Sequence, residues 1–146
     1  MYFIERKKIE AILSYMEDLL SELKKPAQDS LWDNMALERI TQMVIESMID
    51  TGNMMIDGFI MRDPGGYEDI IDILTDEKVI EKTQCESYKQ VIGLRKLLVK
   101  DYLAIDHEYM YTVLETNMEA LNQFSGNIIT YLDSELGVAN AFTNEA

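Results

Sequence analysis

The chain is poor in the residues that cross-link or sharply turn a small protein. Its 146 residues include one cysteine, Cys85, together with two prolines and seven glycines. A single cysteine excludes an intramolecular disulfide and a cysteine-based zinc site. Few prolines and glycines argue against a sandwich or barrel, because those folds need many tight turns.

Positive charge and long apolar runs are also scarce. The chain carries 13 basic and 27 acidic side chains, a formal net charge of −14. Such a field repels nucleic acid, so any contact with RNA needs a local basic patch or a partner that supplies the charge. No segment approaches 18 consecutive apolar residues, and the N-terminus lacks a signal-peptide pattern. We therefore expect no membrane span and a cytoplasmic protein.

Apolar residues recur at helical spacing along the whole sequence, without strand-like alternation of useful length. The stripes run from Ile9 to Leu23, from Leu37 to Phe59, from Val91 to Leu98 and from Met110 to Leu132. Four long helices with one or two short ones between them predict one all-α domain over residues 1–146. The expected architecture is an antiparallel four-helix bundle.

Polar signals predict where these helices begin and end. Lys24-Lys25-Pro26 ends the first helix, and Asp63-Pro64-Gly65-Gly66 is the strongest breaker in the chain. Thr83-Gln84-Cys85-Glu86 is expected to form a capping box that opens the third long helix. We expect Asp106 to cap the last helix, and the tail at 137–146, which starts with a helix-ending glycine, to fray.

One segment, residues 93–102 with the sequence G-L-R-K-L-L-V-K-D-Y, carries side chains typical of chemistry rather than packing. Arg95 and Tyr102 stand seven residues apart, so on a continuous helix they lie within roughly 20° of each other. A guanidinium and a phenol on one face can hold a phosphate. The segment therefore predicts a phosphate-handling site.

The densest positive cluster outside the N-terminus surrounds this segment and consists of Lys89, Arg95, Lys96 and Lys100. A solvated helix flank explains the cluster as well as a phosphate site does. The phosphate interpretation draws its support from Arg95 and Tyr102, which are expected to share a face. Under that interpretation, Lys89 and Lys96 are further candidate contacts to RNA or phosphate.

Five segments follow one another in a recognisable order: L-E-R-x-x-Q-x-x-I-E at Leu37–Glu46, the turn at Asp63–Gly66, Tyr67-x-x-x-Ile71, G-L-R-x-x-L-V-x-x-Y at Gly93–Tyr102 and I-D-x-E-x-x-Y at Ile105–Tyr111. Taken in this order, they resemble the HEPN superfamily and within it the HepT-like group. The resemblance covers most of the chain. The segment at 93–102 is its more specific part.

The resemblance implies a metal-independent ribonuclease toxin without a cofactor. It implies a homodimer whose paired R-x-x-x-x-H-x-Y motifs line a cleft, and a minimal nucleotidyltransferase antitoxin that can adenylylate the motif tyrosine. By position, Arg95 matches the arginine and Tyr102 the tyrosine, whereas Lys100 occupies the place of the histidine. The implied roles are phosphate contact and transition-state charge for Arg95, a cation at Lys100, and a phosphate-side phenol and modification site at Tyr102.

The lysine changes the expected chemistry. Metal-free RNA cleavage takes a proton from a 2′-hydroxyl and gives one to the departing 5′-oxygen, which suits a group that titrates near neutrality. At pH 7 a lysine with the reference pKa near 10.4 is neutral in about one molecule in 2,500, unlike histidine, whose pKa is near 6.5. An ideal helix also places Lys100 about 140° from Arg95. The groups converge only if the helix unwinds near its end or a second protomer contributes, and we predict weakened or absent cleavage.

Other interpretations remain open. His107 is the only histidine; we interpret it as a solvent-facing residue in the first turn of the last helix, and the alternative is that it supplies the missing imidazole from either protomer. A single histidine excludes a di-iron bundle, which needs Glu-x-x-His pairs on two helices, so we expect no metal site. The rival function is a non-catalytic helical dimer that binds a nucleotide, RNA or a nucleotidyltransferase.

Overall fold

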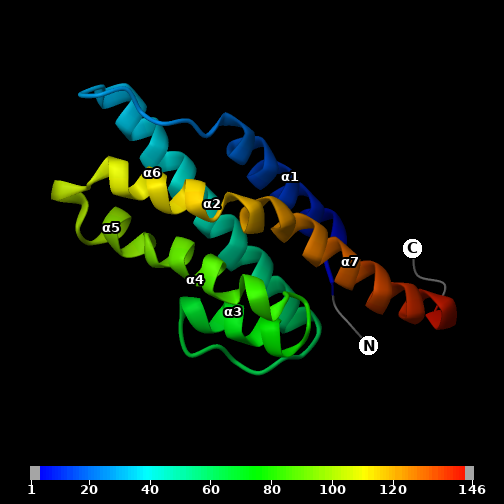
Figure 1. The fold of residues 1–146 in the computed structure, drawn as a ribbon. Coiled ribbons are helices and arrows are strands. Elements are labelled where there is room, and N and C mark those ends of the chain that lie inside the picture. The colour runs from blue at the N-terminus through cyan, green and yellow to red at the C-terminus, as the bar shows by residue number, and fades with distance from the viewer. Residues whose placement is uncertain (1–3, 144–146) are drawn as a thin grey trace.

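The computed structural model describes residues 4–143, which form helices and no strand (Figure 1). The α-helices are α1 (Arg6–Glu22), α2 (Leu31–Gly58), α3 (Tyr67–Asp76), α4 (Cys85–Gly93), α5 (Arg95–Val99), α6 (His107–Thr116) and α7 (Met118–Thr143). Two 3-10 turns, η1 (Lys82–Gln84) and η2 (Tyr102–Ala104), lie between them. The all-α prediction is confirmed, with more short helices than the sequence indicated.

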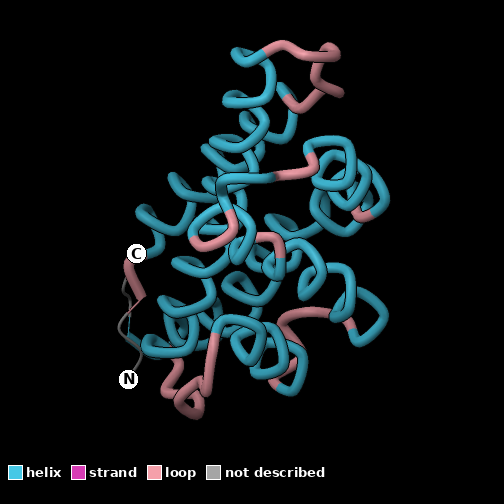
Figure 2. Tube along the Cα trace, turned by 90° about the vertical axis from the view of Figure 1, so that its left-hand side faces the viewer, coloured by secondary structure: helices cyan, strands magenta, loops and turns pink. Residues whose placement is uncertain are grey.

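Helix α2 is the central element of the bundle. Helix α1 packs along it, α7 packs on α1, and α3, α5 and α6 each contact α2 (Figures 1 and 2). The apolar faces of α1 and α2 meet in a core in which Ile9, Ile45 and Met48 have no exposed surface. Burying one such side chain contributes about 1.5–3 kcal/mol. The apolar stripes of the sequence therefore determine this part of the fold.

A glycine of α2 allows α3 to approach closely. A β-carbon added at Gly52 would lie 2.4 Å from Cγ2 of Ile70, closer than two non-bonded carbon atoms can approach. Gly52 itself is buried in the middle of the helix. Its cost to helix stability, about 1 kcal/mol relative to alanine, is offset by the contact that it permits.

Some predicted boundaries are confirmed. The turn at 63–66 separates α2 from α3, and the carboxylate of Asp106 caps α6 by accepting a hydrogen bond from the backbone N–H of Tyr109 at 3.0 Å. The predicted capping box at Thr83 and Glu86 is wrong. Glu81 and Gln84 form a capping box instead, because η1 precedes α4 and places Thr83 inside the 3-10 turn.

The last predicted helix is two helices, and its predicted end is wrong. Helices α6 and α7 are separated at Asn117, whose side-chain amide donates to the carbonyl of Val113 at 2.8 Å and to Gln90 of α4 at 3.1 Å. Helix α7 then continues past Gly137 to Thr143. A lone glycine costs a helix only about 1 kcal/mol, too little to end it without a second signal. Residues 144–146 of the predicted frayed tail lie outside the described residues.

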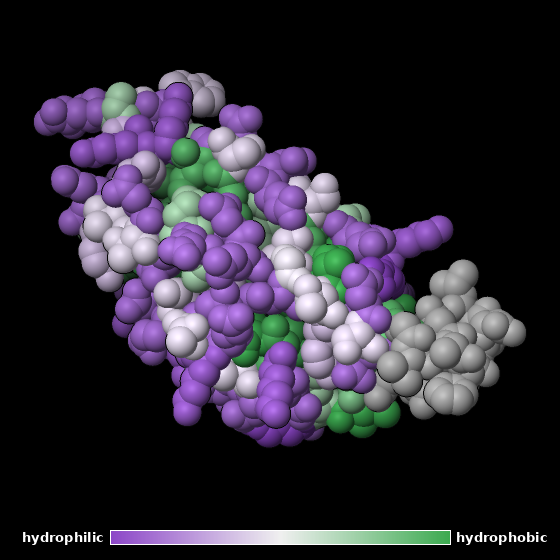
Figure 3. Space-filling view, turned by 45° about the vertical axis from the view of Figure 1, so that its right-hand side comes forward, coloured by the Kyte–Doolittle hydropathy of each residue, from purple (hydrophilic) through white to green (hydrophobic). Residues whose placement is uncertain are grey.

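The surface is strongly polar, as the net charge of −14 requires. Hydrophilic residues cover most of the face drawn in Figure 3, with smaller apolar areas between them. Among the described residues, no helix combines the length and apolar character needed to cross a membrane.

Candidate functional site

The segment singled out in the sequence is broken into short pieces. Helix α4 ends at Gly93, α5 covers only Arg95–Val99, and Tyr102 begins the 3-10 turn η2. The backbone N–H groups of Lys100 and Asp101 both donate to the carbonyl of Lys96, at 2.9 and 3.1 Å, which closes the helix. The prediction that Arg95 and Tyr102 share a face of one continuous helix is therefore wrong. The helix unwinds at its end instead.

Arg95 is held from two other helices. Its Nε donates to Oε1 of Glu46 on α2 at 2.9 Å, and its Cζ lies 4.4 Å from the ring centre of Tyr67 at the start of α3. The hydrogen bond to Glu46 raises the pKa of Arg95 above its usual value. The side chain is 27% exposed, and its two Nη groups have no hydrogen-bond partner among the described residues. The guanidinium is thus fixed through one nitrogen and one face, and a planar edge remains available for a bidentate contact with phosphate.

Unlike Arg95, Lys100 and Tyr102 are not held by other side chains in the described part of the chain. Both are exposed, Tyr102 to 60%, and neither side chain has a hydrogen bond or ion pair within residues 4–143. Lys100 is the residue that ends α5, with φ −118° and ψ −48°. The exposed ammonium group suits a cationic role.

The two additional lysines of the cluster, Lys89 and Lys96, differ in whether they have an ion-pair partner. Lys89 forms an ion pair with Asp72 of α3 at 2.6 Å, and the hydrogen bond to this carboxylate raises the pKa of Lys89. Lys96 is exposed and lies at the rim of a groove. Of the two, Lys96 is therefore the one available to a ligand without the loss of an ion pair.

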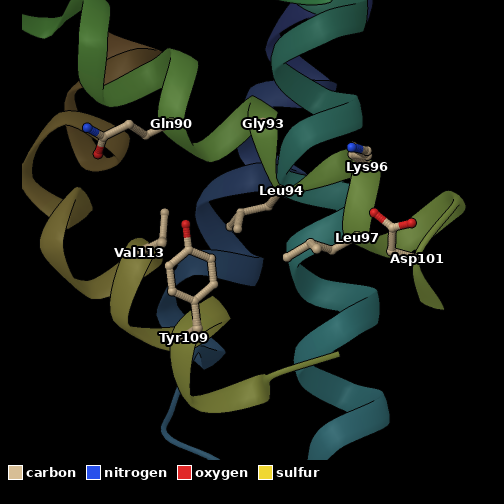
Figure 4. Close-up of a pocket in the computed structure, with 8 residues that line it drawn as sticks. All are labelled: Gln90, Gly93, Leu94, Lys96, Leu97, Asp101, Tyr109 and Val113. Atoms are coloured by element: carbon tan, nitrogen blue, oxygen red, sulfur yellow. The ribbon is translucent and has the colours of Figure 1, made fainter. Parts of the chain in front are cut away.

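This groove of about 520 Å³ lies between α4–α5 and α6 (Figure 4). Leu94 and Leu97 face Val113 and the ring of Tyr109 across it. Its lining residues are Gln90, Gly93, Leu94, Lys96, Leu97, Asp101, Tyr109 and Val113. Arg95, Lys100 and Tyr102 are not among them, so the groove and the motif side chains are neighbouring but distinct features.

His107 was expected to face solvent, but it is paired with a side chain of another helix. Its Nε2 lies 2.7 Å from Oε2 of Glu38 on α2, and each side chain is only 21% exposed. Glu38 precedes Glu46 by eight residues on the same helix, so α2 holds both ends of the segment from Arg95 to His107.

Glu38, Glu46 and Tyr67 hold the candidate site residues, but no sequence motif predicts this role for them. The available signal was the pair of carboxylates that α2 carries beside otherwise buried positions, since acidic residues are rarely buried without a partner. Their partners lie 49 and 69 residues further along the chain, and only the fold brings them together. Within residues 4–143, no group of three or more His, Cys, Asp or Glu side chains could hold a metal ion.

Known proteins resemble the chain in sequence and in fold. The Bacillus subtilis (strain 168) protein described as "Putative RNase YutE" is 44% identical over 143 residues, which cover 97% of this chain and 99% of that protein. The solved structure of YutE, described as a cytosolic protein of unknown function, has a TM-score of 0.89 and covers 94% of this chain and 96% of its own.

Two more distant structures share the fold. A toxin–antitoxin crystal structure with AMP-PNP has a TM-score of 0.71 at 17% identity, over 82% of this chain and 96% of that one. A tri-AMPylated Shewanella oneidensis HEPN toxin in complex with MNT antitoxin has a TM-score of 0.66 at 18% identity, over 84% and 91%. The sequence profile of the family described as "Ribonuclease HepT-like" matches residues 7–128. With most of its length matched to that profile, this chain belongs to the ribonuclease HepT-like family.

Proposed function

We propose that this protein is the toxin-type component of a toxin–antitoxin pair, a homodimeric metal-independent ribonuclease whose activity is weakened by Lys100. The observation that carries the proposal is the fixed guanidinium of Arg95. Glu46 and Tyr67 hold it from two helices while its Nη edge stays free, in a chain of the HepT-like family. A fixed cation of this kind can bind a phosphate and stabilise the charge that develops on it during cleavage.

The three motif residues have different roles. Arg95 contacts the phosphate, and Lys100 adds a second positive charge from the exposed end of α5. Tyr102 places a phenol on the phosphate side, and its exposed hydroxyl is also the proposed site of adenylylation by a nucleotidyltransferase antitoxin. Lys96 is a further RNA contact. Lys89 takes part only if it leaves Asp72.

Dimer formation is supported by apolar side chains around the motif. Val99 is 39% exposed and Leu103 is 91% exposed, and both are adjacent in sequence to the motif residues. Exposed apolar groups beside a functional segment are typical of an interface. The two-fold arrangement would bring two copies of Arg95 to a common cleft. We also propose a cytoplasmic location, as the description of YutE indicates for that relative.

The test is cleavage of single-stranded RNA by the purified protein in the presence of a metal chelator. We expect little cleavage by the wild type and a clear increase for Lys100→His, because an imidazole titrates near neutrality. Arg95→Ala should abolish the activity of the Lys100→His protein. The matched control is Arg6→Ala, which removes another carboxylate-paired arginine, on α1. Absence of cleavage in the Lys100→His protein would contradict the proposal.

The second candidate function is a non-catalytic dimer that holds a nucleotide, RNA or a nucleotidyltransferase. The exposure of Lys100 and Tyr102 favours it, because both groups can bind without any proton transfer. In that case single-stranded RNA or a nucleotide should protect Tyr102 from chemical modification. No protection, together with no affinity at low salt, would count against binding.

A further inference from the structure

The proposed cleavage has no neutral base at its motif, and the one imidazole of the chain lies at the far end of the same segment. His107 is the only histidine in the 146 residues. Its Nε2 lies 2.7 Å from Oε2 of Glu38, in a pair that is neither fully exposed nor closed to solvent. An imidazole oriented by a carboxylate is the arrangement by which many enzymes hold a general base.

The pairing with Glu38 leaves the other ring nitrogen free. Since a carboxylate accepts hydrogen bonds, Nε2 carries the proton in the neutral ring and Nδ1 keeps its lone pair. Nδ1 has no hydrogen-bond partner in the part of the chain that the structure describes. In a neutral ring held in this way, Nδ1 is the nitrogen that can accept a proton from a substrate.

The same helix anchors this imidazole and Arg95. Glu38 and Glu46 are eight residues apart on α2, a rise of about 12 Å along its axis. One carboxylate holds His107 and the other holds Arg95, and the exposed Lys100 and Tyr102 lie on the segment that joins them. In the order of the chain, this segment carries a guanidinium, an ammonium, a phenol and an imidazole.

We infer that His107 is a catalytic residue of the proposed ribonuclease and that Glu38 is its positioning residue. This inference rests on the proposed function. Nδ1 of His107 removes the proton of the 2′-hydroxyl, the 2′-oxygen bonds to phosphorus, and the bond from phosphorus to the 5′-oxygen breaks. The departing oxygen takes a proton from the Lys100 ammonium, and the proton on His107 returns to Lys100 through water. The products are a 2′,3′-cyclic phosphate and a 5′-hydroxyl, with no net change in protons.

The experiment compares His107→Gln in two backgrounds, using single-stranded RNA and a metal chelator. Glutamine keeps a side-chain hydrogen-bond donor for Glu38 but cannot act as a base. We expect His107→Gln to lower wild-type cleavage by about a hundredfold, the usual size of a general-base contribution. In the Lys100→His background the factor should be much smaller, because the motif then has its own imidazole and the two effects are not additive.

Each outcome decides between the two proposals. The same factor in both backgrounds, or no loss in the wild type, gives His107 a merely structural role and overturns the inference. Cleavage by the Lys100→His protein without measurable wild-type cleavage also overturns it and leaves the proposed function standing. No cleavage by either protein contradicts the proposed function itself.

The positioning role of Glu38 has to be tested with a measurement that does not change when the protein is merely less stable. Since the chain has one histidine, its nitrogen NMR spectrum reports one imidazole. Glu38→Gln should change the balance of the two ring tautomers and lower wild-type cleavage, while Glu38→Asp should restore part of both. A tautomer balance that Glu38→Gln leaves unchanged would remove the positioning role, and unfolding curves of each variant exclude loss of folding as the cause.

Discussion

The body of the bundle and the segment from Leu94 to His107 are built on different principles. In the body, α1 and α2 are long, and their apolar faces meet in a core without exposed surface at Ile9, Ile45 and Met48. The segment has a five-residue helix and a 3-10 turn, and polar contacts with Glu46 and Glu38 anchor both of its ends. Packing therefore determines the body, whereas a few directed polar contacts determine the segment that carries the candidate chemistry.

The sharpest test of this comparison removes a large apolar side chain from each region. Met48→Ala should lower the free energy of unfolding by about 2–5 kcal/mol, because it leaves a cavity in a close-packed core. Leu103→Ala should change the free energy of unfolding of the monomer by less than about 0.5 kcal/mol, since this side chain is 91% exposed within one chain. Denaturant unfolding of both variants, at protein concentrations too low for the proposed dimer, measures the difference. Equal losses under these conditions would contradict the comparison.

A smaller effect is expected where the polar contacts anchor the segment. Glu46→Ala leaves the half-buried Arg95 without its carboxylate and should lower the free energy of unfolding by about 1–2 kcal/mol. Hydrogen exchange should show faster opening of residues 95–99 than of α1. The control is Glu77→Ala, at an exposed position just after α3. If the two variants behave alike, Glu46 does not fix the segment.

Loss of the side chain that caps α6 should lower the free energy of unfolding by as much as Glu46→Ala or by less. Asp106→Ala removes the acceptor for the backbone N–H of Tyr109 and should cost about 1 kcal/mol. Asp106→Asn keeps a capping oxygen and should restore most of the loss, as thermal unfolding can measure. An alanine variant as stable as the wild type would show that the His107–Glu38 pair alone determines where α6 begins.

The smallest effect concerns pH and the turn that precedes α3. Arg62 lowers the pKa of Asp69 to about 2 through a hydrogen bond, and the backbone N–H of Gly65 contributes further. Because the folded-state pKa lies below the usual value of 3.8, this group stabilises the fold above that value. The contribution is lost as the pH falls from about 4 to about 2. Asp69→Asn should flatten the pH dependence of unfolding in this interval, and an unchanged slope would contradict the assignment.

Much of the bundle was predictable from local patterns. The apolar stripes, the breaker at 63–66 and the cap at Asp106 act through neighbouring residues, and the structure confirms them. Two of the wrong predictions concern helices expected to be continuous through Leu94 and through Asn117. At Asn117 a contact with the distant Gln90 competes with the helical pattern, and after Leu94 the backbone of the short helix closes it at Lys96.

The sequence by itself determined the helical class and the family resemblance, because these depend on residue types and their spacing along the chain. Only the tertiary structure decided that Glu46 and Tyr67 hold Arg95 and that Glu38 holds His107. These partners are far apart in sequence, and a hydrogen bond forms only where packing brings a donor and an acceptor to about 3 Å with the right direction.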